Sequence, residues 1–192
     1  MTSASATRPS PRERLLDAAG RLFYQEGVGI GVEALCKAAG VSKRSMYQLF
    51  ATKDELLAAA LERQGPGLRA VLRPPDTSAT PRARVLYVFE RLEEHASAPD
   101  FLGCPYLAVQ VELKRTDHPA SLVASDRKQA LCDFFRGEAE RGGAADPALL
   151  ARQLMLVYDG ASARAGIKAD ALTDRLAVTT AATLMDAAGI PA

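Results

Sequence analysis

The chain has 192 residues, 48% of them hydrophobic, and a formal net charge of +1 at pH 7. This composition excludes an intrinsically disordered chain. A nearly neutral protein offers no bulk electrostatic argument for nucleic-acid binding, so such an argument must be local. The three cysteines (Cys36, Cys104 and Cys132) form no CxxC pair, and the two histidines are not at metal-ligand spacing. We therefore expect no metal and no cofactor, and the free thiols suit a reducing cytoplasm.

No apolar run approaches the roughly 18–20 residues of a membrane span, so we expect no membrane partner. Residues 1–10 are rich in Ser, Thr and Ala and lack the apolar segment of a secretory signal. We interpret them as a flexible tail and expect a cytoplasmic protein.

The first predicted elements are helices, since apolar residues recur at helical rather than strand spacing. A helix begins near Pro11 and ends near Gly27. Short helices are predicted over 32–39 and 43–49, with Gly40 as a turn residue between them and Ser42 as a cap. Thr52 and Glu55 have capping-box spacing, so a fourth helix starts there and runs to about residue 64, where Gly65-Pro66-Gly67 breaks it.

The rest of the chain predicts more helices, most of which open with a proline. They cover about 81–97, 105–116, 119–141, 147–165 and 170–188. The proline-rich stretch near residues 73–81 is the best candidate for a boundary between functional regions. The predicted fold is all-α, with about nine helices: a three-helix helix-turn-helix domain in residues 11–64, and a helical bundle in residues 65–192.

Two short helices joined by a tight turn are typical of a helix-turn-helix, whose second helix fits the major groove of DNA. Val41 and Met46 are expected to anchor the second helix. Its other face would present residue types that contact phosphates and base edges: Ser42, Lys43, Arg44, Ser45, Tyr47 and Gln48. Lys53 follows at the start of the next helix, a position that favours an anion such as phosphate.

These residues resemble the TetR/AcrR family of bacterial transcriptional regulators across roughly residues 12–62. The resemblance rests on Leu15-Leu16-x-Ala18-Ala19-x-x-Leu22-Phe23, Glu26-Gly27-Val28, Leu35-x-x-Ala38-Ala39-Gly40-Val41-Ser42-Lys43, Met46-Tyr47-x-x-Phe50 and Lys53-Asp54-Glu55-Leu56. The resemblance implies a bacterial, nucleoid-associated homodimer that reads double-stranded DNA with its N-terminal domain. It also implies that residues 65–192 serve small-effector binding and dimerisation. Gly31 stands where the family often has Thr, so the cap there should be weaker.

If the family layout holds, several C-terminal side chains surround a cavity for a small-molecule effector: Phe89, Tyr106, Val109, Gln110, Phe134, Leu154 and Tyr158. Ordinary core packing is the alternative for each of them. The last two helices carry Leu and Ala residues that suit a two-fold four-helix interface. The alternative is that these two helices pack only within one subunit.

We expect a regulator, a repressor released from an inverted-repeat operator by its effector, and not an enzyme. A helical ligand-binding protein without DNA binding is one alternative, and a helical enzyme is another. The sequence has no nucleophile–base pair, metal cluster or phosphate loop to favour the enzyme. Cys104 has two interpretations, an oxidant-sensitive thiol ahead of a helix or a small buried hydrophobe.

Overall fold

The computed structural model describes residues 9–190 of the chain. Within this range the protein is entirely helical, with no strand, which confirms the all-α prediction and the expected helix count. The helices are α1 (Pro11–Glu26), α2 (Val32–Ala39), α3 (Lys43–Leu49), α4 (Lys53–Leu72), α5 (Pro81–Ala96), α6 (Pro105–Leu113), α7 (Pro119–Arg141), α8 (Pro147–Gly166), the 3-10 helix η1 (Thr173–Arg175) and α9 (Leu176–Ala187). None of the helices in residues 9–190 is both long and apolar enough to span a bilayer.

Local signals set most helix starts. Proline occupies the first turn of α1, α5, α6, α7 and α8, as predicted. Asp146 caps α8, as expected. Ser10 caps α1 in a reciprocal capping box with Glu13, so the end of the expected tail is ordered. The rest of that tail, residues 1–8, lies outside the described residues.

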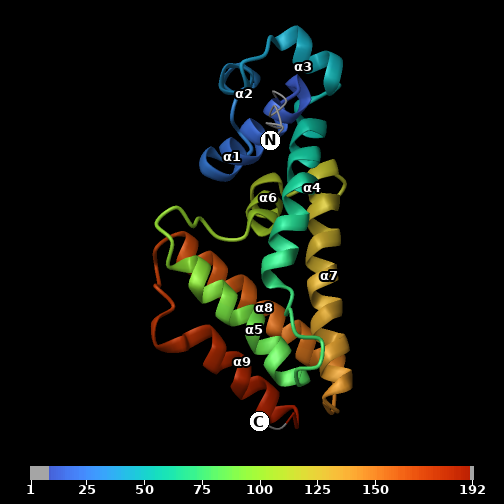
Figure 1. Ribbon diagram of the computed structural model, residues 1–192, viewed down its shortest axis with the longest axis vertical. Coiled ribbons are helices and arrows are strands. Elements are labelled where there is room, and N and C mark those ends of the chain that lie inside the picture. Colours follow the sequence, from blue (N-terminus) through green and yellow to red (C-terminus); the bar gives the residue numbers. More distant parts are fainter. Residues whose placement is uncertain (1–8, 191–192) are drawn as a thin grey trace, which may run out of the picture.

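The N-terminal helices pack around one apolar core. Leu15 and Leu22 of α1, Leu35 of α2, Met46 of α3 and Leu56 of α4 are all buried. Figure 1 shows α1, α2 and α3 gathered at one end of the molecule, with α4 leading away from them alongside α7. This small core fixes the orientation of α2 and α3 relative to α4.

The predicted break of α4 near residue 64 is wrong, because the helix continues through Pro66 to Leu72. An interior proline costs about 3 kcal/mol in an isolated helix, and tertiary packing must offset that cost. Leu68 and Leu72 pack against the core, and Gly65 is buried beneath the guanidinium of Arg127. The division of the chain at residues 64 and 65 stays a prediction, and α4 runs across it.

The C-terminal helices form a bundle in which α5, α7, α8 and α9 pack together below α6 (Figure 1). Phe89 of α5 stacks on Phe135 of α7 at a centroid distance of 5.7 Å, and Tyr158 of α8 meets Phe89 edge-on at 6.4 Å. Arg84 of α5 and Glu138 of α7 form a buried ion pair at 2.9 Å. An aromatic cluster and a buried charge pair therefore join the three long helices.

The last predicted helix, 170–188, is shorter than expected. The backbone has positive φ at Leu172, Asp174 and Arg175, and α9 begins only at Leu176. Glu93 of α5 accepts hydrogen bonds from the N–H groups of residues 177 and 178, at 2.8 and 3.2 Å. The cap of α9 thus comes from another helix, which explains why local sequence signals misplaced its start. Similarly, α6 ends at Leu113 rather than 116, with Lys114 in the left-handed region.

Candidate functional site

The turn between α2 and α3 is tight. Gly40 adopts a left-handed conformation (φ 62°, ψ 43°) that suits glycine. The Val41 N–H donates to the Cys36 carbonyl at 3.0 Å, which closes the end of α2. Ser42 then caps α3 by accepting from the Ser45 N–H at 3.0 Å. At the other end of α2, Gly31 provides no side-chain cap, as its residue type predicts.

One face of α3 is buried and the other is exposed. Met46 and the following Phe50 are buried, and Val41 is half-buried, so the predicted anchors are confirmed. The exposed polar side chains on α3 are Lys43, Arg44, Tyr47 and Gln48, and the apolar Leu49 is exposed beside them. This arrangement presents two cations, an amide and a phenol together on one short helix, the donor types that contact phosphates and base edges.

Three of the side chains predicted to contact DNA, Ser42, Lys43 and Ser45, already have partners within the protein. Ser42 and Ser45 form the cap, and their hydroxyl oxygens are 2.9 Å apart. Lys43 pairs with Glu33 of α2 at 3.1 Å, but both side chains are largely exposed. Exposed pairs of this kind stabilise proteins by at most about 1 kcal/mol, so the Lys43 ammonium can turn toward a phosphate at little cost.

Lys53 lies apart from the exposed face. Its ammonium donates to the carbonyls of Val28 and Ile30, at 2.8 and 3.3 Å, and so holds the α1–α2 loop on the start of α4. An ammonium has three protons, so one is left for a phosphate. The predicted anion contact of Lys53 stays a prediction, and its loop contacts were not anticipated.

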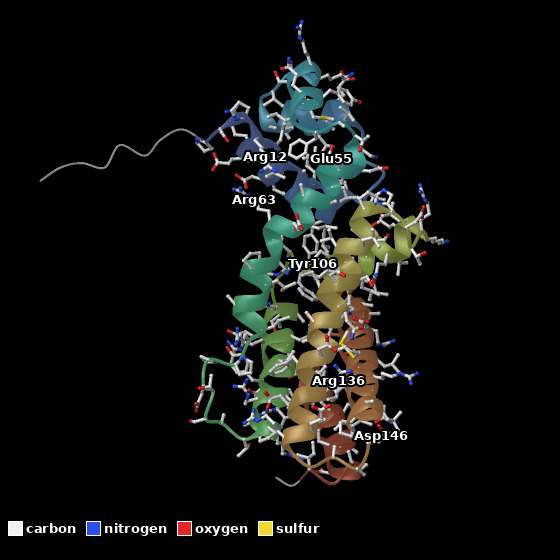
Figure 2. The ribbon with its side chains drawn as sticks, turned by 90° about the vertical axis from the view of Figure 1, so that its right-hand side faces the viewer. Arg12, Glu55, Arg63, Tyr106, Arg136 and Asp146 are labelled. Atoms are coloured by element: carbon white, nitrogen blue, oxygen red, sulfur yellow. The ribbon has the colours of Figure 1, made fainter. Side chains whose placement is uncertain are left out.

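Arg14 has a structural role that the sequence did not reveal. Its guanidinium donates to the carbonyls of Ala39, Pro9 and Gly40, at 3.0, 2.9 and 3.4 Å. It therefore satisfies carbonyls at the end of α2, 25 or more residues away in sequence. Arg12, also on α1, has its guanidinium 5.3 Å from the centre of the Phe50 ring. Figure 2 labels it among the N-terminal helices.

A cavity of about 330 Å³ lies between the C-terminal part of α4 and helices α5–α8. Its lining residues are Gly65, Leu68, Leu72, Arg73, Arg84, Cys104, Tyr106, Arg127, Lys128, Ala130, Leu131, Phe134 and Tyr158. Three predicted effector-site residues, Tyr106, Phe134 and Tyr158, are among them. Figure 2 places Tyr106 near the middle of the molecule, between the two ends of the fold. Burial raises the pKa of the Tyr158 phenol, so it lines the cavity as a neutral group.

The other four predicted effector-site residues do not line this cavity. Phe89 and Leu154 are fully buried in the bundle core, and Gln110 is half-buried outside the lining. Val109 lies in the junction of α6 with α1 and α4. The family resemblance implied that the helices carrying these side chains surround a cavity, but which positions border a void depends on the packing of all five helices.

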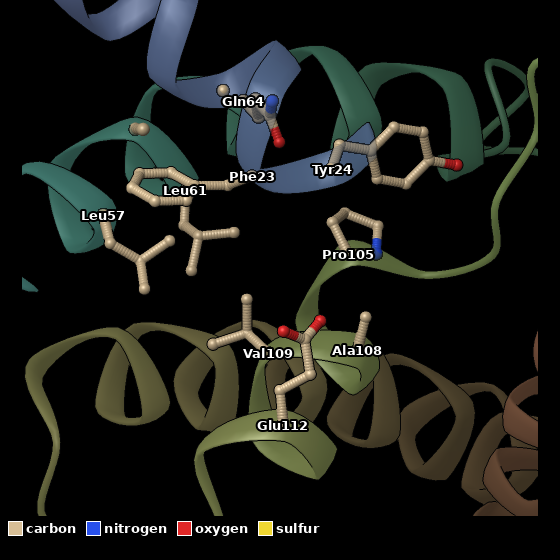
Figure 3. Close-up of a pocket in the computed structure, with 11 residues that line it drawn as sticks. Phe23, Tyr24, Leu57, Leu61, Gln64, Pro105, Ala108, Val109 and Glu112 are labelled. Carbon is tan, nitrogen blue, oxygen red and sulfur yellow. The ribbon is translucent and has the colours of Figure 1, made fainter. Parts of the chain in front are cut away.

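The junction around Val109 is nearly filled. Figure 3 shows side chains of α1 and α4, including Phe23, Leu57 and Leu61, facing Val109 and Ala108 of α6. The gap between them is about 20 Å³, room for roughly one water molecule and not for an effector. We interpret this junction as a packed contact that joins the N-terminal helices to the C-terminal bundle.

Two polar side chains, Tyr24 and Glu112, reinforce this junction through three hydrogen bonds. The Tyr24 hydroxyl of α1 accepts from the Leu102 N–H at 2.7 Å and donates to the Gly103 carbonyl at 3.0 Å. Burial raises the pKa of Tyr24, so the phenol stays protonated as a donor. Glu112 of α6 accepts from the Val28 N–H at 2.8 Å. Movement of α6 would therefore be transmitted to α1 and to the α1–α2 loop.

Four cations on the cavity wall were missed by the sequence analysis: Arg73, Arg84, Arg127 and Lys128. Aromatic and apolar residues are the usual lining of an effector site, whereas basic residues on helices are more often solvated. Lys128 pairs with Asp159, and burial lowers the pKa of its ammonium. Cys104 also lines the cavity and is buried, as a small hydrophobe would be. No cluster of three or more potential metal ligands occurs within residues 9–190.

Known proteins resemble this chain both in sequence and in fold. The profile of the bacterial regulatory proteins of the tetR family matches residues 15–60. The crystal structure of a TetR transcriptional regulator from Streptomyces avermitilis is 66% identical, with a TM-score of 0.92 over 95% of this chain and 100% of that one. SCO4454, a TetR-family regulator from Streptomyces coelicolor, is 25% identical, with a TM-score of 0.78 over 93% of each chain.

A more distant relative is the transcriptional activator FasR of Mycolicibacterium smegmatis. It is 31% identical over 134 residues, which are 62% of this chain and 61% of FasR. The match with the Streptomyces avermitilis regulator covers both the helix-turn-helix and the C-terminal bundle. The chain therefore belongs to the TetR family of bacterial transcriptional regulators and is a DNA-binding helix-turn-helix protein.

Proposed function

We propose that this protein is a ligand-responsive repressor that binds an inverted-repeat operator as a homodimer and is released by a small molecule. The observation that carries the proposal is the course of α4. Its first turns pack under the helix-turn-helix through Leu56 and Leu57, and its last turns line the 330 Å³ cavity through Leu68 and Leu72. One helix therefore connects the DNA-reading end to the effector cavity.

Reading of the operator is assigned to the exposed face of α3. Two subunits would place their α3 helices in successive major grooves, roughly 34–36 Å apart. Arg44 and Lys43 can pair with guanine edges or phosphates, and Tyr47 with a phosphate. A dimer with two-fold symmetry then requires an operator with inverted-repeat symmetry.

The first test is selection of bound sequences from random duplex DNA, followed by fluorescence anisotropy at two salt concentrations. We expect an enriched inverted repeat and a steep salt dependence, with log K falling by about 0.9 per neutralised phosphate for each unit of log salt. A folded dimer that enriches no sequence would contradict the proposal and favour a ligand-binding protein that does not read DNA.

Arg44→Ala should relax the preference at one base pair of each half-site. The lost contact corresponds to roughly tenfold discrimination between bases. Competition binding with operators mutated at each position measures it. Arg136→Ala, which removes an exposed arginine on α7, is the control and should leave every preference unchanged. If Arg44→Ala instead weakened binding equally for all sequences, Arg44 would be a phosphate contact and not a base reader.

The proposed dimer interface is the outer face of α8 and α9. Leu156 of α8 and Ile167, the residue that follows this helix, are 74% and 76% exposed. Gly160 and Ala163 lie between them on the same exposed stripe. On α9, Leu176 is also exposed (45%). Monomeric proteins rarely expose such continuous apolar stripes, and small residues allow a second copy of the helix to approach closely.

Leu156→Glu should therefore shift the protein toward monomer and weaken operator binding together, because a charge would be buried at the two-fold contact. Sedimentation velocity over a concentration series measures the oligomeric state. Leu122→Glu is the matched control, since Leu122 is also exposed (53%) but lies on α7. A Leu156→Glu protein with an unchanged dimer equilibrium would remove α8 from the interface.

The operator is released if the effector binds more tightly to a form of the dimer in which the two α3 helices are wrongly spaced for the operator. The coupling free energy between effector binding and operator binding is typically about 1–3 kcal/mol in such proteins. The same equilibrium can serve repression or activation, and FasR is named an activator. A reporter under the control of the selected operator separates the two: repression predicts that deleting the protein raises expression.

A further inference from the structure

The walls of the cavity are chemically divided. Tyr106, Phe134 and Tyr158 provide aromatic surface, with leucines beside them, and four cations border the same space. Among the described residues, no side chain that lines the cavity is a carboxylate. A mostly apolar cavity of this size, with a few charged groups, is typical of a site for a small amphipathic molecule.

Two of the four cations are already neutralised. Arg84 pairs with Glu138 at 2.9 Å and also donates to the Asp76 carbonyl at 2.7 Å. Lys128 pairs with Asp159, and its ammonium lies 5.3 Å from the centre of the Tyr158 ring. These two charges have protein partners and need no ligand.

The other two cations, Arg73 and Arg127, form no ion pair with any carboxylate in the described part of the chain. Arg127 lies on α7 and is half-buried. Its guanidinium packs on α4 at Gly65 so closely that a Cβ added to this glycine would lie 3.0–3.2 Å from the guanidinium atoms. Arg73 is exposed just beyond the end of α4. A partly desolvated guanidinium beside apolar walls is costly unless an anion pairs with it.

We propose that the cavity binds a small amphipathic anion, with an aromatic or hydrocarbon body against Tyr106, Phe134 and Tyr158 and its anionic group on Arg127. Arg73 assists at the rim. Arg127 contacts α4 at Gly65. An anion bound to Arg127 therefore lies next to the helix that connects the cavity to the helix-turn-helix. This inference rests on the proposed function, since it names the chemical class of the effector.

Isothermal titration calorimetry of the full-length protein tests the charge with one aromatic body and three head groups: 2-naphthoate, 2-naphthamide and 2-naphthyl phosphate. We expect an anion to bind at least about tenfold more tightly than the amide, since hydrogen bonds to charged groups are the stronger ones. A tighter phosphate than carboxylate would support the anionic class and identify its head group.

Substitution of Arg127 locates the site. Arg127→Met keeps the apolar stem and should abolish the preference for the anion, while Arg127→Lys should retain part of it. Arg136→Met, on the same helix but outside the cavity, should bind like the wild type. Thermal unfolding of each variant shows that it is folded.

The outcomes separate this inference from the proposed function. Equal affinity for the amide and the anions, or an unaltered preference in Arg127→Met, overturns the anionic head group but leaves a ligand-responsive regulator intact. Failure of both anions to bind a protein that still binds its selected operator also overturns the inference. If neither the wild type nor any variant bound an operator, that result would instead count against the proposed function.

Discussion

Glu138→Ala should lower the free energy of unfolding by about 3 kcal/mol, because it leaves the buried Arg84 guanidinium without its carboxylate. The Arg84 and Glu138 side chains are only 9% and 7% exposed. Glu138 also accepts from Arg141 at 2.6 Å, so one carboxylate serves two arginines. Urea denaturation of wild type and variant, followed by circular dichroism, measures the difference.

Two further variants make this interpretation specific. Glu140→Ala removes a carboxylate from the same helix, but its pair with Arg136 is exposed and 4.0 Å long, so the expected change is below about 0.5 kcal/mol. Replacing both partners, with Arg84→Met and Glu138→Leu together, should restore much of the stability lost in the single variant. A Glu138→Ala protein as stable as Glu140→Ala would show that solvent in the adjoining cavity compensates for the Arg84 charge.

The DNA-reading end was the most predictable part of the molecule because its signals are local. Gly40 marks a left-handed turn, Ser42 caps α3, and Met46 faces inward at helical spacing, and each of these depends on neighbours within a few residues. The exposed face of α3 follows from the same spacing. Prolines in the first turns located the starts of the later helices for the same reason.

Features that depend on distant packing could not be predicted in this way. The continuation of α4 past Pro66 requires α7, and the start of α9 requires Glu93 of α5. Arg14 and Lys53 resemble solvated or DNA-contacting cations in the sequence, yet both donate to backbone carbonyls of the α1–α2 region. The effector cavity belongs to this class, since its lining combines five helices.

Met46→Ala should reduce the free energy of unfolding by about 2–5 kcal/mol, the usual range for removing a fully buried methionine side chain. The helix that carries Met46 has only seven residues, and a helix of this length is not stable alone in water. Its orientation therefore depends on packing against α1 and α2. Chemical denaturation measures the stability, and anisotropy with the selected operator measures binding.

The Met46→Ala variant distinguishes the effect of how α3 is positioned from the effect of the side chains that α3 presents to DNA. Met46→Ala leaves Arg44, Lys43 and Tyr47 in place, so operator affinity should fall while the preferred bases stay the same. Leu49→Ala removes an exposed apolar side chain from the same helix and should change stability by less than about 0.5 kcal/mol. If Met46→Ala matched Leu49→Ala in stability, packing beneath α3 would not hold it, and contacts with DNA itself would have to order the reading helix.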